Sequence, residues 1–220
     1  MQLNTSVTRP PEAILQTNQL IKNTYTLLSM TLIFAGITAF IGVAMAAPFG
    51  LALGANLVAI GLLWFVLPKV SNSASGIPVL FGITGLLGFG LGPLIGHYLA
   101  MDSSIVMTAL GGTGAIFLGL SGYALTTRKD FSFMGGFLMV GLIVVIGASL
   151  LNIFVQIPAL SLAVSAAVVM IMSGLILYQT SAMINGGETN YIMATAGLFL
   201  SILNLFTALL HLLGVFSGDD

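Results

Sequence analysis

The sequence predicts an all-α integral membrane protein, with seven transmembrane helices in a compact bundle. Composition is the first reason, because 58% of the 220 residues are hydrophobic and 5% are charged, whereas a soluble protein carries about 25% charged residues. The second reason is that long uncharged runs separate the few charges. A helix that crosses a hydrocarbon core of about 30 Å needs about 20 apolar residues, so these runs can be divided into spans.

Three uncharged runs hold one span each, namely Val70–Met101, Ser103–Thr127 and Thr189–Gly218. The runs Asn23–Pro68 and Phe131–Gly187 are too long for one crossing, and a proline turn divides each of them, at Pro48 and at Pro158. Six spans with one re-entrant segment are the structural alternative. We place the seven spans, with ends uncertain by about 2–4 residues, at roughly 24–46, 50–68, 77–100, 104–126, 133–156, 159–181 and 190–215.

The positive charges predict the orientation. With seven spans, all five Lys and Arg residues fall on one face of the membrane: Arg9, Lys22, Lys69, Arg128 and Lys129. Lys and Arg stay on the cytoplasmic side, so we expect a cytoplasmic N-terminus and an outer C-terminus, with Lys69, Arg128 and Lys129 as the topology determinants. The net charge of -1 without a basic cluster argues against nucleic acid as a partner.

The chain divides into three parts. Residues 1–22 are polar and contain the pair Pro10–Pro11, so we expect a flexible cytoplasmic tail. Residues 23–216 form the transmembrane domain, and residues 217–220 form a short C-terminal tail.

Small residues at spacings of three and four predict which helix faces point inward, because membrane helices pack through small side chains. In the third span these residues are Gly85, Gly88, Gly92 and Gly96. In the fourth they are Thr108, Gly112, Ala115, Gly119, Gly122 and Thr126, so we expect both helices to be central. In the seventh they are Ala194, Gly197, Ser201, Asn204, Ala208 and His211.

Asn204 lies in the middle of a span, where an unpaired amide costs several kcal/mol. We therefore expect it to find a partner inside the bundle, with Asn56 and Asn152 as candidates for the same cluster. His97 and His211 lie near the outer ends of their spans and are interpreted as interfacial anchors.

Nothing in the sequence indicates catalysis. The chain has no cysteine, and no carboxylate falls within a predicted span to orient a base or activate water. Histidine and carboxylate spacings typical of a metal site are missing too. We therefore predict a protein that is not an enzyme and that holds no cofactor or metal.

Two stretches carry a family resemblance, YALTTRKDFSFMGGFL between the fourth and fifth spans and LFLSILNLFTALLHLLG in the seventh. Together with TGLLGFGLGPLI in the third span and NIFVQIPAL at the turn between the fifth and sixth, they are similar to the Bax inhibitor-1 family, in particular to its bacterial YccA-like branch. The resemblance implies a seven-helix bundle in a bacterial inner membrane, with one helix surrounded by the others.

The resemblance also implies two functions. Calcium-leak members of the family have a pH-sensitive gate formed by two aspartates, but the matching positions here are Gln179 and Ser201, which argues against calcium as a partner. Members of the YccA-like branch are associated with the ATP-dependent membrane protease FtsH as substrate and inhibitor. Our first hypothesis is therefore an FtsH modulator. The alternatives are a pH-sensitive calcium or proton leak channel and a purely structural membrane interaction protein.

Gln179 lies about seven residues before the Gly186–Gly187 turn and Ser201 about eleven after Asn190, so on antiparallel helices their depths differ by about 6 Å. We therefore predict that they hydrogen-bond to one another or to Asn204. This candidate gate or polar cluster, Gln179, Ser201 and Asn204, would hold the cytoplasmic end of the last two helices closed at any pH, because an amide and a hydroxyl do not titrate near neutrality.

Overall fold

The computed structural model describes residues 11–217, and all of the regular structure in this range is helical. Seven helical segments are long and apolar enough to cross a membrane, which confirms the predicted number of spans. The second span combines α2, a π-helical segment η1 and α3, and the third combines α4 and α5. The elements are α1 (Pro11–Ala44), α2 (Phe49–Gly61), η1 (Leu62–Val66), α3 (Leu67–Val70), α4 (Gly76–Gly90), α5 (Gly92–Met101), α6 (Ser103–Thr127), α7 (Met134–Val155), α8 (Pro158–Asn185) and α9 (Tyr191–Ser217).

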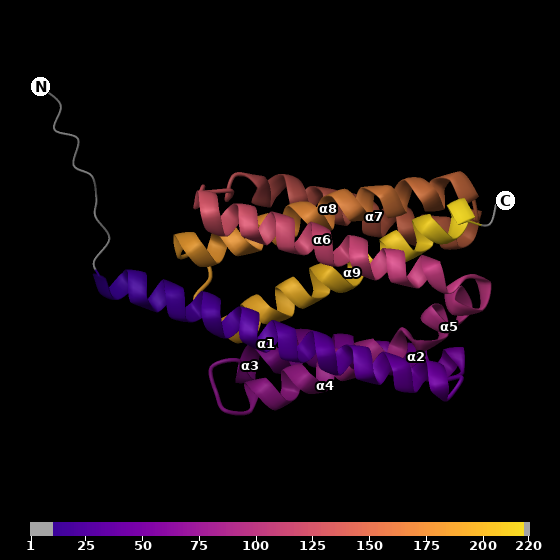
Figure 1. Ribbon diagram of the computed structural model, residues 1–220, viewed down its shortest axis with the longest axis horizontal. Helices are drawn as coiled ribbons and strands as arrows, with labels where there is room; N and C mark the ends of the chain where they lie inside the picture. The colour runs from indigo at the N-terminus through magenta and orange to yellow at the C-terminus, as the bar shows by residue number, and fades with distance from the viewer. Residues whose placement is uncertain (1–10, 218–220) are drawn as a thin grey trace, which may run out of the picture.

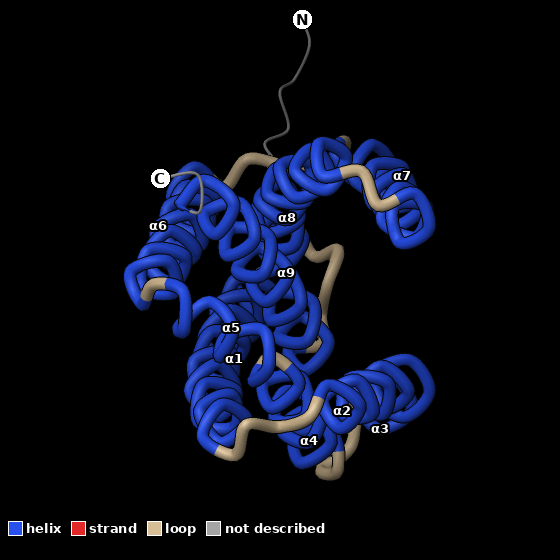
Figure 2. Tube along the Cα trace, turned by 90° about the vertical axis from the view of Figure 1, so that its right-hand side faces the viewer, coloured by secondary structure: helices blue, strands red, loops and turns tan. Residues whose placement is uncertain are grey.

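Helix α9 lies in the centre of the bundle (Figure 2). It packs against α1, α4, α6 and α8, whereas α7 packs on α8 and α2 packs on α4 at the periphery. Burial agrees with this arrangement, since 50% of the most apolar stretch of α9 is buried, against 11% for α7. One helix is therefore surrounded by others, as the family resemblance implies.

The turns between spans lie where the sequence predicts them. The turn between α1 and α2 ends at Pro48, and the turn between α7 and α8 contains Gln156, whose φ of 53° is left-handed. Gly186 caps the C-terminal end of helix α8, where a φ of 83° favours glycine. Arg128 caps helix α6 and is also left-handed, with a φ of 51°.

The first span differs from the prediction at its beginning. Helix α1 begins at Pro11, so residues 11–22 of the expected tail are helical and continue directly into the span. Proline is favoured at the first position of a helix, and Leu20 and Ile21 pack against the main hydrophobic core, which explains the extension. Residues 1–10 of the expected tail and residues 218–220 lie outside the described residues.

Gly85, Gly88 and Gly92 of the third span face inward, as predicted, whereas a Cβ atom at Gly96 would meet nothing within 4 Å. Gly88 and Gly92 are buried against α1, and a Cβ atom at Gly92 would lie 2.6 Å from the carbonyl carbon of Gly42. A Cβ atom at Gly42 would in turn lie 2.7 Å from the carbonyl oxygen of Phe89. The two backbones are therefore so close that only glycine fits at this crossing.

The prediction for the fourth span was wrong. Gly119 and Gly122 are exposed, and a Cβ atom on either would meet nothing within 4 Å. The opposite face of α6 is the buried one, and there Ala109 packs with Phe206 and Leu210 of α9. Side chains rather than close backbones fill the space between α6 and α9, so the small residues are left on the outer face. The buried residues of α6 are Ile105, Val106, Ala109, Thr113, Ser121 and Ala124.

We expect Gly92→Leu to destabilise the bundle and Gly119→Leu to leave it nearly unchanged. The first change forces a four-carbon side chain between two touching backbones, and overpacking of this kind costs about 1–3 kcal/mol or more. The second adds the same side chain to an open face, where effects stay within about 0.5 kcal/mol. Thermal unfolding of both variants in detergent measures the difference, and equal melting temperatures would contradict the close α1–α5 crossing.

Candidate functional site

Six buried hydroxyl-bearing residues gather in the half of the bundle that contains the N-terminal end of α1. Each is at most 3% exposed, and they come from α1, α6, α8 and α9. Lipid offers no hydrogen-bond partner, so such groups are normally satisfied within the protein. Thr24 is the exception, because its buried Oγ1 has no hydrogen-bond partner among the described residues. We call this set the polar layer: Thr24, Ser121, Thr180, Ser181, Thr195 and Ser201.

Hydrogen bonds in the polar layer join helices that are distant in the sequence. The hydroxyl oxygen of Tyr25 lies 3.2 Å from Oγ1 of Thr180, and Oγ of Ser121 lies 3.4 Å from the same atom, so α8 is joined to both α1 and α6. Oγ1 of Thr195 donates to the carbonyl oxygen of its own helix at Tyr191, at 2.6 Å, and lies 3.3 Å from that of Thr24. The layer therefore ties the central helix α9 to α1 as well.

The predicted contact between Gln179 and Ser201 is confirmed. Oγ of Ser201 donates to Oε1 of Gln179 at 3.2 Å, and Ser201 is 2% exposed. Gly197, one turn earlier on α9, leaves room for the amide, because a Cβ atom there would lie 3.2 Å from Nε2 of Gln179. An uncharged amide–hydroxyl pair thus joins α8 to α9 next to Thr180.

Asn204 does not join this pair, contrary to the prediction. Its side chain is exposed on α9, and Nδ2 donates to the carbonyl oxygen of Leu200 at 2.8 Å. An amide can be satisfied by its own helix in this way, so a position in mid-membrane does not require a partner on another helix. The other two candidates are elsewhere, since Asn152 accepts a hydrogen bond from the backbone of Ile157 at 3.0 Å and Asn56 lies against Gly90.

The charged loop between α6 and α7 is attached to α8 beside the polar layer. Oγ of Ser181 accepts a hydrogen bond from the backbone N–H of Phe131 at 2.9 Å and donates to the carbonyl oxygen of Lys129 at 3.1 Å. Nδ2 of Asn185 lies 3.5 Å from the same carbonyl oxygen. The main chain of the loop, and not its charged side chains, therefore makes these contacts. Sequence reasoning identified the charges but missed Ser181, which looks like any other helical serine.

The carboxylate of this loop is satisfied locally. Asp130 accepts hydrogen bonds from the backbone N–H and from the hydroxyl of Ser132. Both bonds lower the pKa of its carboxyl group, the backbone bond more than the hydroxyl bond. Asp130 therefore stays charged at neutral pH and stabilises the turn that leads into α7.

A polar cavity of about 210 Å³ lies at the end of α8 and α9 opposite the polar layer. There the ring of His211 lies between two hydroxyls, with Nδ1 2.9 Å from Oγ of Ser165 and Nε2 3.2 Å from Oγ of Ser161. His97, in contrast, lies against the ring of Tyr98. Within residues 11–217, no group of three His, Cys, Asp or Glu side chains could hold a metal ion.

Comparison with known proteins shows one family along nearly the whole chain. The family model described as inhibitor of apoptosis-promoting Bax1 matches residues 17–218. An uncharacterized membrane protein of Vibrio cholerae is 49% identical over 211 residues, 95% of each chain. A protein of Escherichia coli K12 named modulator of FtsH protease YccA is 46% identical over 210 residues, 94% of each chain. An uncharacterized Pseudomonas aeruginosa protein is 44% identical over 223 residues, covering 100% of this chain and 97% of its own.

We expect Ser181→Ala to release the loop between α6 and α7 without unfolding the bundle. The change leaves the N–H of Phe131 and the carbonyl oxygen of Lys129 without this partner, and one such lost contact costs about 1–3 kcal/mol. Hydrogen–deuterium exchange over residues 128–134 should become faster. Thr126→Ala is the matched control, because that hydroxyl bonds only to its own helix at Gly122; equal exchange in the two variants would show that Ser181 does not hold the loop.

Proposed function

This chain belongs to the Bax inhibitor-1 family, and on that premise we propose that it modulates the ATP-dependent membrane protease FtsH, as a substrate that occupies and thereby inhibits the enzyme. It is a multi-pass inner-membrane protein. The observation that carries the proposal is the 46% identity, over 94% of both chains, to the protein named modulator of FtsH protease YccA. A likeness over 94% of the chain includes the loops between the spans, where such a protease could contact the protein.

The polar layer supports a role through a partner rather than through conduction. A pH-sensitive leak needs a group that changes its charge near neutrality, and the pair at the position of the family gate consists of Gln179 and Ser201. Neither side chain titrates in that range. The buried hydroxyls around this pair are uncharged as well, so we infer that the bundle stays closed when the pH changes.

We propose that two segments contact the protease, the beginning of α1 and the loop between α6 and α7, and both lie at one end of the molecule. The beginning of α1 and the loop between α6 and α7 are both at the left of Figure 1, the end that the positive charges predict to be cytoplasmic. FtsH draws its energy from ATP, which is found in the cytoplasm, so contact with this end is what the proposal requires.

We expect this protein to slow the degradation of a second membrane substrate when both are reconstituted with purified FtsH and ATP. It should itself be degraded, more slowly after removal of residues 2–10, because that deletion shortens the end we expect the enzyme to grip. Removal of residues 218–220, at the other predicted face, is the control and should leave its half-life unchanged. A substrate half-life that does not respond to the added protein would contradict the proposed function, and equal half-lives of the two shortened forms would exclude the N-terminal end as the handle.

The double change Gln179→Asp with Ser201→Asp tests the leak-channel alternative. Two carboxylates at this contact would share a proton, because desolvation and like charge raise one pKa well above about 4. We expect calcium flux through the double variant in liposomes to depend on pH between about 6 and 8, where the unmodified amide and hydroxyl do not titrate.

The single changes Gln179→Asp and Ser201→Asp are the controls for the pair. Each adds a carboxylate without a second one beside it, so each should lack the pH response of the double variant. A double variant that conducts no more calcium than the unmodified protein at any pH would show that this bundle has no latent pore at the family gate.

A further inference from the structure

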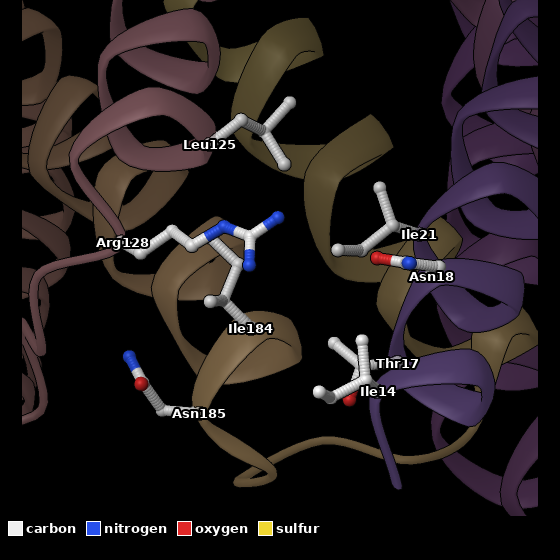
Figure 3. A pocket seen from close by; sticks show the side chains of 8 residues that line it. All are labelled: Ile14, Thr17, Asn18, Ile21, Leu125, Arg128, Ile184 and Asn185. Atoms are coloured by element: carbon white, nitrogen blue, oxygen red, sulfur yellow. The ribbon is translucent and has the colours of Figure 1, made fainter. Parts of the chain in front are cut away.

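A cavity of about 440 Å³ opens where the first turns of α1 meet the ends of α6 and α8 (Figure 3). Half of its lining is aliphatic and half is polar, and one lining residue is charged. The lining residues are Ile14, Thr17, Asn18, Ile21, Leu125, Arg128, Ile184 and Asn185. The cavity adjoins the polar layer at one point, where Nδ2 of Asn185 donates to Oγ of Ser181 at 3.1 Å.

The guanidinium group of Arg128 points into this cavity, toward Ile21 and Asn18 of α1 (Figure 3). The side chain has this direction because Arg128 is the left-handed residue that ends α6, with a φ of 51°, and the chain turns away from the helix at that point. An arginine side chain offers five N–H donors in a planar fork that matches the oxygens of a phosphate or a carboxylate.

The described acidic side chains are occupied elsewhere. Asp102 accepts hydrogen bonds from Ser104, Asp130 from the backbone of Ser132, and Glu188 from the backbone of Asn190 at 2.7 Å. Each bond is to a residue two positions away, and no ion pair joins Arg128 to a carboxylate within the described part of the chain. Among the described side chains, Arg128 therefore presents to the cavity a positive charge that no carboxylate pairs with, above aliphatic walls.

The length of α1 places this cavity at the depth of the lipid headgroups. The apolar part of α1, Ile14–Ala44, has 31 residues and therefore measures about 46 Å, whereas the hydrocarbon core is about 30 Å thick. Only a short turn follows Ala44 before α2 begins at Phe49, so we assign the excess of about 16 Å, or about 11 residues, to the N-terminal end. That excess contains every α1 residue that lines the cavity.

We propose that this cavity binds the phosphate of an anionic phospholipid in the leaflet that faces the cytoplasm. Arg128 donates two parallel hydrogen bonds to the phosphate oxygens, the geometry in which arginine binds phosphate most strongly. Ile14, Ile21 and Leu125 contact the glycerol and the first methylene groups. An anionic headgroup fits better than a zwitterionic one, because the described lining residues include no carboxylate or aromatic ring for a headgroup ammonium. The bound lipid would connect α1 to α6 and α8 at the end where the layer's hydrogen bonds also join them.

The test compares Arg128→Gln with Lys129→Gln, two variants that remove one positive charge from the same loop. Lys129 contributes its backbone carbonyl to Ser181, which the change leaves in place, and its side chain does not line the cavity. Bound lipid is counted by native mass spectrometry of the detergent-purified chain with phosphatidylglycerol, and thermal unfolding without lipid checks that each variant is folded. We expect Arg128→Gln to bind phosphatidylglycerol about tenfold more weakly or worse, since it loses a charge-assisted pair of hydrogen bonds, and Lys129→Gln to bind it as the unmodified protein does.

Two further probes test whether the ligand is an anionic lipid, a zwitterionic lipid or free phosphate. Phosphatidylcholine should bind the unmodified protein more weakly than phosphatidylglycerol, and inorganic phosphate should neither compete with the lipid nor raise the melting temperature. Equal binding of the two lipids, equal losses in the two variants, or stabilisation by inorganic phosphate alone would each overturn the assignment.

Discussion

The structure depends on one constraint, which is that a hydroxyl buried among transmembrane helices has no water to bond with. Thr180 meets this constraint by lying within hydrogen-bond distance of Tyr25 on α1 and Ser121 on α6, and Ser201 meets it by bonding to Gln179. Because lipid provides no hydrophobic force between helices, these bonds and close packing decide which helices stay together. The central position of α9 follows, since it carries the apolar surface and the polar groups that four other helices cover.

The same layer connects the interior of the bundle to its charged loop. Ser181 follows Thr180 in the chain, and its hydroxyl bonds to the main chain of the loop at Lys129 and Phe131. A partner that pulls on this loop therefore acts on α8 next to the Gln179–Ser201 pair. Gln179 and the hydroxyls of the polar layer do not titrate near neutrality, so under the proposed function we expect a partner on this loop to affect the layer more directly than pH does.

Hydropathy and turn residues predicted the seven spans because both signals can be read from one segment without knowing its neighbours. The thickness of the lipid also requires a similar length of every span. The Gln179–Ser201 contact was predictable because two antiparallel helices joined by a short turn fix the relative depth of their residues. The faces of the helices were harder to predict. Small residues on α6 have the same spacing whether they face lipid or protein, and Asn204 satisfies its amide on its own helix, so neither pattern contains information about neighbours.

The central proposal is that the polar layer closes, regardless of pH, the end of the bundle that the positive charges predict to be cytoplasmic. The chain contains no cysteine, so a single introduced cysteine can be labelled selectively. The measurement is the rate at which a water-soluble maleimide, added on the predicted cytoplasmic side, labels Ser201→Cys at about pH 6 and pH 8. This rate is divided by the labelling rate of Ser75→Cys, because both thiols become more reactive as the pH rises. Ser75 is exposed in the loop before α4, whereas Ser201 is 2% exposed. A ratio near zero at both pH values is the predicted result, and a ratio that rises toward one at either pH would show that the layer opens.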